Sequence, residues 1–564
     1  MTRWFDQMNQ ELTDYQQQAA DLTWRGMIGV ATGPTHLLAI RRNRWREWKC
    51  KEAISFPESD LDDQHRRMIY ILCRGPRYTD RSITKNLKLR GHLGWLYETT
   101  RVCLRGIGCL RSEPDLDLLM RENRDPETRL SVWQGLRDTI GPKSRNTFET
   151  LIALENQAAR ASGYSDIGQC WREELEIPHL IKVADDLFSQ IAPFYQLLHA
   201  FVRYRLGQFY GERLIPLVEP IPAHLLGNMW SSAWDGMMDI VSPVDLGLDA
   251  AVRRLFPTAE DMLKSAEDYY ASLGLPRMTK RFWEKSFYSV SNNSQPTSCH
   301  GTAANLFKPG DVRMLLCTRI NWEDFYVVHH EMGHIQYFMA YDEKPMIFQD
   351  GANSAVQETI GDAIMLAVAS PEHLFATGIL NNTSPETEMT LMLMLALNKI
   401  PQLAYGLILD KWRWDIMASK VDADSYNELW WKYRLEYQGV RPPVPRYRNS
   451  LDPMSKFHVA DTTPYIRYFL SGFLQFQFLD VMCTDESKPA RPLHKCDLYG
   501  NKVAGEKLRS LMENGLEKPW NEALGEFSNG KYITVSAEPL LKYFSPLVRY
   551  LEEQLNNQGI PIGW

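Results

Sequence analysis

The chain has 564 residues, of which 44% are hydrophobic and 24% are charged, as in an ordinary globular protein. This composition excludes a disordered, collagenous or low-complexity chain. The 63 Lys and Arg residues and the 70 Asp and Glu residues give a net charge of −7 and a pI of about 6.1. That charge argues against a dedicated nucleic-acid-binding protein, whereas a basic substrate remains compatible with it.

No Gly/Ser-rich linker, internal repeat or long charge block divides the chain, so we expect a single domain over residues 1–564. Residues 1–18 lack the apolar core of a signal peptide. The nearest candidate, 389–397, is interrupted by Thr390 and is shorter than the roughly 18 apolar residues that a membrane-spanning helix needs. We therefore expect no membrane segment in this chain.

Residues 41–51, RRNRWREWKCK, form the one basic run with interleaved tryptophans. In an acidic chain we interpret this run as the solvated face of a helix, and binding of a nucleic acid or an anionic surface is the alternative. Residues 180–202 carry apolar side chains at three- and four-residue spacing, which predicts an amphipathic helix. Strand-like runs are few, with a candidate at 312–317. The pattern predicts a mainly α fold with few short strands.

The nine cysteines contain no CxxC pair, and two close pairs, Cys103/Cys109 and Cys299/Cys317, are typical of small disulfide loops. N-glycosylation acceptor sequences begin at Asn292, Asn381 and Asn382. Because disulfides and N-glycans belong to the secretory pathway, these features favour a secreted, extracellular protein, trimmed of any signal peptide.

His330-Glu331-Met332-Gly333-His334 is an HExxH motif within 322–339, a stretch with helical spacing and no proline. Four residues are slightly more than one helical turn, so both imidazoles project from one face and can share one Zn²⁺ ion. Glu331 lies beside them and can act as the base for a water molecule. The motif also occurs by chance on helices with ordinary surface histidines, so a third ligand has to be found.

Glu358 is the candidate for this third ligand, because it follows His334 by 24 residues and precedes the apolar helical run 363–369. A His₂Glu ligand set leaves the fourth zinc position open for water. Asp362, one helical turn after Glu358, is placed to hold a ligand histidine by its second ring nitrogen.

With these residues, the sequence resembles the angiotensin-converting-enzyme family of zinc peptidyl-dipeptidases. The similarity extends from about Cys103 to the C-terminus, and its further motifs lie at residues 221–230, 329–337, 351–353, 464–468 and 492–497. It implies a large helical ellipsoid with a deep central cleft between two subdomains and zinc at the floor of the cleft. It also implies that N-terminal helices in residues 1–100 cover a catalytic body in residues 101–564.

The resemblance further implies a residue-by-residue site. Zn²⁺ would be bound by His330, His334 and Glu358, with Glu331 as general base and acid. The oxyanion would be stabilised by His458 and Tyr468. The C-terminal carboxylate of a short peptide would be bound by Lys456 and Tyr465, and the peptide would be aligned by His300 and the backbone of Gly301. These roles describe a secreted peptidyl-dipeptidase.

The same resemblance pairs the cysteines as Cys103–Cys109, Cys299–Cys317 and Cys483–Cys496. It leaves Cys50, Cys73 and Cys170 unassigned, with room for a fourth disulfide and one free thiol.

Several positions depart from the family pattern. Ser232 replaces a glutamine that shares the substrate carboxylate, and a lost charged hydrogen bond weakens binding about ten- to hundredfold. Gln357 replaces a histidine, while Gln402 and Gly472 replace phenylalanines, so we expect a roomier and more polar pocket.

The chloride sites of the family are also altered. Arg467 is retained, but Leu175 and Pro142 replace its tyrosine partner and the arginine of the other site, which predicts weak chloride dependence.

Two alternatives to dipeptide release stay open. Ser232 is compatible with a single-residue carboxypeptidase or a broad oligopeptidase, and the chain could also be a non-catalytic member that binds peptides or a partner.

Overall fold

The computed structural model describes residues 1–30, 33, 35–242, 244–288, 301–484 and 491–564. These residues contain 22 α-helices and six short strands, which confirms the mainly α fold. The first half of the chain forms α1 (Thr2–Met27), α2 (Thr35–Ile54), α3 (Asp63–Cys73), α4 (Asp80–Thr99), β1 (Arg101–Leu104), β2 (Gly108–Arg111), α5 (Asp117–Glu122), α6 (Pro126–Arg160), α7 (Ile167–Glu174), α8 (Leu180–Tyr210), β3 (Ile221–Pro222), α9 (Met238–Val241), α10 (Leu248–Leu255), α11 (Ala259–Ser272) and α12 (Lys280–Lys285).

The second half forms β4 (Thr302–Asn305), β5 (Val312–Leu315), α13 (Trp322–Ala340), α14 (Ser354–Val368), α15 (Pro371–Ala376), α16 (Pro385–Met417), α17 (Tyr426–Gln438), β6 (Val440–Arg441), α18 (Phe457–Ala460), α19 (Ile466–Cys483), α20 (Lys502–Glu513), α21 (Trp520–Phe527) and α22 (Glu538–Gln558). The strands pair only two by two: β1 with β2 and β4 with β5 antiparallel, and β3 with β6 parallel. The predicted helix at 180–202 and the predicted strand at 312–317 are both present, as α8 and β5.

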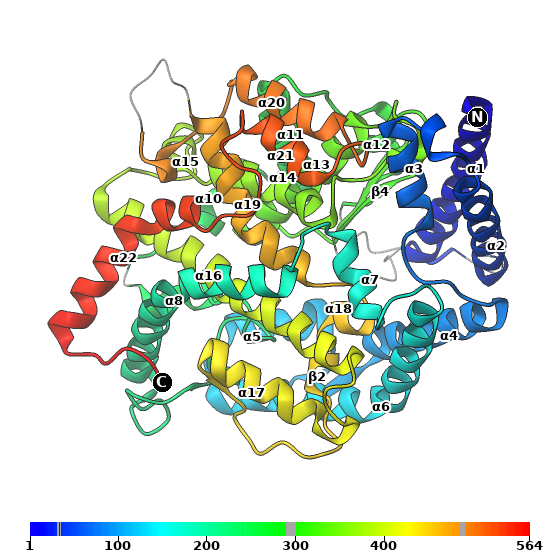
Figure 1. Ribbon diagram of the computed structural model, residues 1–564. Helices are drawn as coiled ribbons and strands as arrows, with labels where there is room; N and C mark the ends of the chain where they lie inside the picture. Colours follow the sequence, from blue (N-terminus) through cyan, green and yellow to red (C-terminus); the bar gives the residue numbers. More distant parts are fainter. Residues whose placement is uncertain (31–32, 34, 243, 289–300, 485–490) are drawn as a thin grey trace.

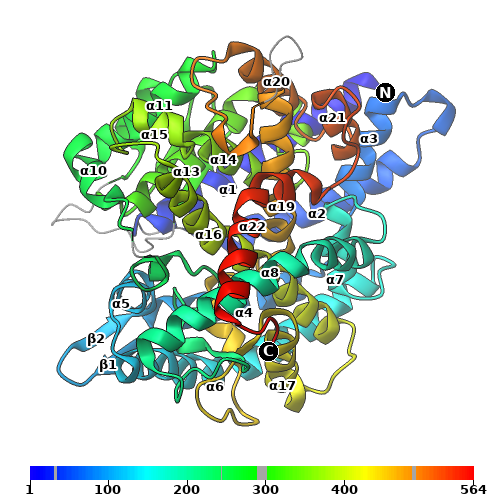
Figure 2. The same ribbon diagram turned by 90° about the vertical axis from the view of Figure 1, so that its left-hand side faces the viewer.

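The helices fall into two groups (Figures 1 and 2). In Figure 1, α11, α13, α14 and α20 lie in the upper part of the molecule, whereas α4, α6 and α17 lie in the lower part, and α16 crosses between them. The centre of the fold consists of α14, α16 and α19, whose side chains are almost all buried. A helix that is apolar on every side is stable only when other elements surround it, so these three helices form the core.

In the described part of the chain, α16 is the one helix that is long and apolar enough to cross a membrane. Its most apolar window is 89% buried within the protein, as in a core helix. Pro401 within α16 has no N–H, so the carbonyl of Leu397 one turn earlier loses its helical partner. The backbone N–H of Trp234 donates to this carbonyl at 2.8 Å, which attaches the 228–234 loop to α16.

The first three helices pack as a separate layer on the body. Phe5, Met8 and Leu12 of α1 share an apolar cluster with residues of α2 and α3, with 346–348 and with Leu516. The Asn9 side chain accepts from the backbone N–H of Ile347 at 3.0 Å, and Gln17 donates to the carbonyl of Phe307 at 2.6 Å. Leu93 and Tyr97 of α4 belong instead to the main core, so the part that packs separately is α1 to α3.

The basic run 41–51 is helical, as expected, but only part of it is a solvated face. Trp45 and Lys49 are buried. The indole of Trp45 donates to Glu11 of α1 at 2.6 Å, and Lys49 makes an ion pair with the same carboxylate at 3.2 Å. The run therefore joins α2 to α1 through Trp45 and Lys49, while the side chains of Arg41, Arg42 and Arg44 are exposed.

The disulfides agree with the expected pairs wherever both partners are described. Cys103–Cys109 closes the β1–β2 hairpin, and Cys483–Cys496 follows α19. Cys317 is disulfide-bonded, and its predicted partner Cys299 lies outside the described residues. The unassigned cysteines resolve into a fourth bond, Cys50–Cys73, which joins α2 to α3, and a buried free thiol at Cys170, whose pKa burial raises to about 12.

Helices α13 and α14 cross in direct backbone contact, where Gly333 meets Gly361. A Cβ atom on Gly333 would lie 2.5 Å from the backbone nitrogen of Gly361, and one on Gly361 would lie 2.3 Å from the carbonyl oxygen of His330. Neither space admits a methyl group, because both neighbours are backbone atoms. This close approach brings Glu358 of α14 within reach of His330 and His334 of α13.

We predict that Gly361→Ala destabilises the protein by about 1–3 kcal/mol or more, because the added methyl group forces the two helices apart. The measurement is the free energy of unfolding in urea. Gly91→Ala is the matched control, since a Cβ on this exposed residue of α4 meets nothing within 4 Å. The control is expected to be neutral or stabilising by up to about 1 kcal/mol. Equal stability of the two variants would contradict the proposed contact.

Candidate active site

Three ligand atoms converge between α13 and α14. Oε2 of Glu358 lies 3.5 Å from Nε2 of His330 and 3.6 Å from Nε2 of His334. Zinc bonds of 2.0–2.1 Å in a tetrahedral arrangement require ligand atoms to be about 3.4 Å apart. The arrangement therefore fits a zinc ion with little adjustment, and the donor set is the one that catalytic zinc sites use. Among the described residues, this is the group whose ligand atoms could hold a metal.

Asp362 orients the first histidine. Its Oδ1 accepts from Nδ1 of His330 at 2.9 Å, which leaves Nε2 of that ring free to bind a metal. The carboxylate also accepts from the Tyr326 hydroxyl at 2.6 Å and from Nζ of Lys399 at 3.1 Å. Burial by itself would raise the pKa of Asp362, but Lys399 and His330 hold it well below its usual range. Asp362 is thus an anion that fixes the tautomer of His330.

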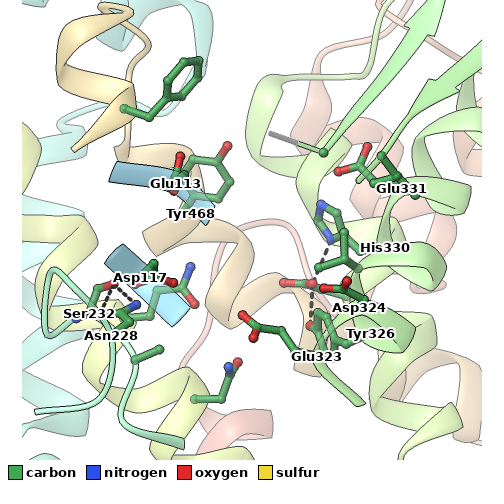
Figure 3. A pocket seen from close by; sticks show the side chains of 18 of the residues that line it. Glu113, Asp117, Asn228, Ser232, Glu323, Asp324, Tyr326, His330, Glu331 and Tyr468 are labelled. Atoms are coloured by element: carbon green, nitrogen blue, oxygen red, sulfur yellow. Dashed lines mark hydrogen bonds and ion pairs between the residues drawn. The ribbon is translucent and has the colours of Figure 1, made fainter. Parts of the chain in front are cut away.

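The convergent group opens into a cavity of about 730 Å³. Figure 3 shows two facing walls, with Glu323, Asp324 and His330 of α13 on one side and Asp117 and Ser232 on the other. Both walls and the floor contribute the residues that the sequence singled out: Ser232, Gly301, His330, Glu331, His334, Gln357, Glu358, Gln402, Lys456, His458, Tyr465 and Tyr468. The structure therefore brings the predicted site together from segments more than 200 residues apart.

Glu331 points into this cavity beside the ligand group (Figure 3). A Cβ on Gly301 would lie 3.3 Å from Oε1 of Glu331, so the backbone at Gly301 passes close to this carboxylate. His300, which the resemblance places next to Gly301, lies outside the described residues, as does Asn292.

His458 and Tyr468 are hydrogen-bonded to each other. Nε2 of His458 and the hydroxyl of Tyr468 are 3.1 Å apart, and both side chains line the cavity. The start of α19, which carries Tyr468, is held by Asp410, whose Oδ2 accepts from the backbone N–H of Tyr465 at 2.7 Å and of Ile466 at 2.6 Å. Two polar groups are thus fixed on the side of the cavity opposite α13.

Lys456 is buried at 8% exposure, and its ammonium lies 3.7 Å from the ring centroid of Trp230. Within the described ranges, no carboxylate lies at ion-pair distance from Nζ. Burial lowers the pKa of Lys456, although Glu113 and Asp117 oppose this shift. The arrangement leaves a desolvated cation directed at the cavity, which is what recognition of a carboxylate requires.

The departures from the family pattern do not all act as expected. Gln402 and Gln357 line the cavity, as predicted. The prediction for Gly472 is wrong: this residue is buried in α19 and is not among the residues that line the cavity. A Cβ there would lie 2.4 Å from Cδ2 of Leu403, so Leu403 of α16 already occupies the space beside it.

The structure also reveals residues that sequence reasoning missed. The cavity wall carries four carboxylates, Glu113, Asp117, Asp235 and Glu323, and the last three lie within 4 Å of Arg121. Arg121 lies 2.8 Å from Glu323 and 3.2 Å from Asp117. No sequence motif predicts this cluster, because its residues come from separate segments that lie together only in the folded chain.

A site of this kind, with HExxH on one helix and a glutamate ligand on the next, defines the class of zinc metallopeptidases. The model of a peptidase family described as angiotensin-converting enzyme matches residues 1–564. Angiotensin-converting enzyme of Sus scrofa is 39% identical over 83% of this chain and 36% of its own length. The enzyme of Theromyzon tessulatum is 34% identical over 84% of this chain and 78% of its own length.

The angiotensin-converting enzyme-like protein Ace3 of Mus musculus is 38% identical over 85% of this chain and 65% of its own length. The chain therefore belongs to the angiotensin-converting enzyme family, as the sequence motifs indicated. It spans about a third of the length of several mammalian relatives that it matches. The family model covers the first hundred residues too, where the motifs had shown little similarity.

We predict that Asp362→Asn lowers zinc affinity about 10–100-fold, because an amide no longer fixes the tautomer of His330. Competition with a chelator at pH 7 measures this affinity. Asp186→Asn, which removes a carboxylate from the exposed face of α8, serves as the control. Undiminished zinc binding by Asp362→Asn would show that the carboxylate does not orient the ligand.

Proposed function

We propose that this chain is a secreted zinc peptidyl-dipeptidase, which removes dipeptides from the C-terminus of short peptides. The observation that carries the proposal is the cavity itself, in which the buried, unpaired ammonium of Lys456 faces the same space as the group of His330, His334 and Glu358. An exopeptidase needs this combination, because a cation at a fixed distance from the reacting centre selects a free C-terminal carboxylate.

Zinc, when bound by His330, His334 and Glu358, supplies a Lewis acid for the scissile carbonyl and lowers the pKa of a water molecule. Glu331 takes a proton from the attacking water and gives it to the leaving amine. His458 and Tyr468 donate hydrogen bonds to the carbonyl oxygen as it gains negative charge. Lys456 and Tyr465 hold the C-terminal carboxylate, and the backbone at Gly301, with His300, aligns the peptide.

The secreted location is part of the proposal and rests on the disulfides. Three bonds, Cys50–Cys73, Cys103–Cys109 and Cys483–Cys496, are typical of an oxidising compartment. Asn381 and Asn382 are exposed, as an N-glycan requires. Weak dependence on chloride stays a prediction. Arg467 is present, but Leu175 has no side-chain hydroxyl, and its backbone carbonyl accepts from Asn353.

The proposal is tested with a free-acid decapeptide and its C-terminally amidated form, incubated with the zinc-loaded protein with and without a chelator. Mass spectrometry identifies the products. Chelator-sensitive loss of two residues from the free acid alone supports the proposal. Loss of one residue would assign a carboxypeptidase, and cleavage of both peptides an oligopeptidase. Zinc binding at unit stoichiometry without any cleavage would assign a peptide- or partner-binding member.

We predict that Glu331→Gln lowers kcat by about 10²–10⁴-fold, because the amide cannot accept a proton from water. Zinc binding is expected to persist, since Glu331 is not one of the three ligands. The measurements are turnover of the decapeptide and the zinc content after dialysis. Substantial residual turnover by zinc-loaded Glu331→Gln would refute its role as general base.

We predict that Ser232→Gln raises kcat/KM for the free-acid peptide about tenfold over that for the amidated peptide, because the longer amide reaches the substrate carboxylate. Ser232 lines the cavity and is hydrogen-bonded to Asn228 at 3.0 Å (Figure 3). Ser232→Ala is the control, since it adds no donor. An unchanged ratio in Ser232→Gln would place the carboxylate away from this residue.

A further inference from the structure

A second cavity, of about 450 Å³, lies between the N-terminal helices and the end of α13. Helices α1 and α2 and the end of α3 form one side of it, and the end of α13 and the segment 346–350 form the other. The residues that decide its chemistry are Arg42, Arg46, Arg74, Phe338, Tyr341 and Asp350. Residues 1–100 thus contribute much of its wall, including all three arginines.

The lining of this cavity is positively charged, with three arginines and one carboxylate. Arg42 makes no hydrogen bond or ion pair within the described part of the chain. Arg46 donates to the carbonyl of Pro76 at 2.6 Å, which satisfies one N–H group and neutralises no charge. Arg74 is 3.1 Å from Glu176, but that carboxylate also binds Arg67 at 2.8 Å. The lining therefore keeps unbalanced positive charge.

The surroundings of the two α2 arginines show the same imbalance. Desolvation and the like charge of Arg46 lower the pKa of Arg42. Desolvation also lowers the pKa of Arg46, where the attraction of Glu47 is opposed by Arg77. The one acidic group of the lining, Asp350, accepts from the backbone N–H of Gly351 at 2.8 Å. An anion bound between the arginines would relieve this repulsion.

The second cavity adjoins the active-site cavity, because Phe338 lines both. Helix α13 runs along the two: Glu323 near its start lines the first cavity, His330 and His334 lie at its middle, and Tyr341 just beyond its end lines the second. The seven residues from His334 to Tyr341 span about 10 Å, which an extended peptide covers with about three residues.

We propose that the arginines of this cavity bind an acidic side chain of the peptide substrate, three or four residues before the scissile bond. The inference rests on the proposed function, in which Lys456 holds the C-terminal end of the peptide inside the first cavity. The N-terminal part of the same peptide then extends past Phe338 towards Arg42 and Arg46. Guanidinium groups recognise carboxylates through paired, charged hydrogen bonds. In this cavity the arginines would bind the peptide carboxylate in a partly enclosed space.

The test compares two free-acid decapeptides that differ only at the third and fourth residues before the scissile bond, both Glu in one and both Gln in the other. The expected kcat/KM ratio is about five- to tenfold in favour of the Glu peptide at low salt. The double variant Arg42→Gln/Arg46→Gln is expected to bring the ratio close to one. Arg41→Gln, which removes the same charge from the adjacent residue that does not line the cavity, is expected to retain the preference.

Dissociation constants for both peptides, measured with Glu331→Gln and with Glu331→Gln carrying the Arg42/Arg46 substitutions, give a readout that needs no turnover. If neither peptide is cleaved but the Glu peptide still binds more tightly, the proposed function fails and the arginine site stands. Equal affinity for the two peptides, or a preference that survives the double variant, overturns the arginine site. The preference for the Glu peptide, in kcat/KM and in affinity, is also measured in NaCl and in a glutamate salt. Equal loss of the preference in the two salts supports carboxylate recognition. Loss in NaCl alone identifies the site as one for a free inorganic anion and overturns the proposal.

Discussion

The direct backbone contact between α13 and α14 is the constraint on which the site depends. Two glycines, Gly333 and Gly361, remove the side chains that normally keep helices 8–10 Å apart. Only at this separation does Glu358 of α14 come close to Nε2 of His330 on α13, while Asp362 of α14 binds Nδ1 of the same ring. The HExxH motif supplies two of the three ligands, but the glycines allow the third ligand, Glu358, to approach them.

Around this contact, the protein distributes charge unevenly between two adjoining cavities. The wall of the active-site cavity carries Glu113, Asp117, Asp235 and Glu323, whereas the lining of the second cavity carries three arginines. With the proposed arginine site, a peptide substrate would be selected by an acidic side chain as well as by its C-terminal carboxylate. The N-terminal layer carries none of the proposed catalytic residues, and residues 1–100 supply all three arginines of the second cavity.

Much of the site was predictable because its information is local. The spacing of His330 and His334 follows from the helical repeat, and Glu358 and Asp362 follow from the same repeat on the next helix. The residues that the resemblance supplied, such as Lys456 and Tyr468, lie in short continuous motifs. What the sequence misplaced or left open depended on packing between distant segments. Leu403 fills the space beside Gly472, and the fourth disulfide that was left open forms between Cys50 and Cys73 of two helices. Part of the run 41–51 is buried against α1, while Arg42 and Arg46 line a cavity. No periodicity in the sequence records these contacts.

The proline in the middle of α16 has a mechanical consequence. Because Pro401 releases the carbonyl of Leu397 to the backbone of Trp234, the loop that carries Trp230 and Ser232 is fastened to the central helix. This hydrogen bond couples the position of the 228–234 loop to that of α16. Ser232 on this loop and Gln402 on α16 both line the active-site cavity, so the released carbonyl ties together two parts of the cavity wall that are far apart in the sequence.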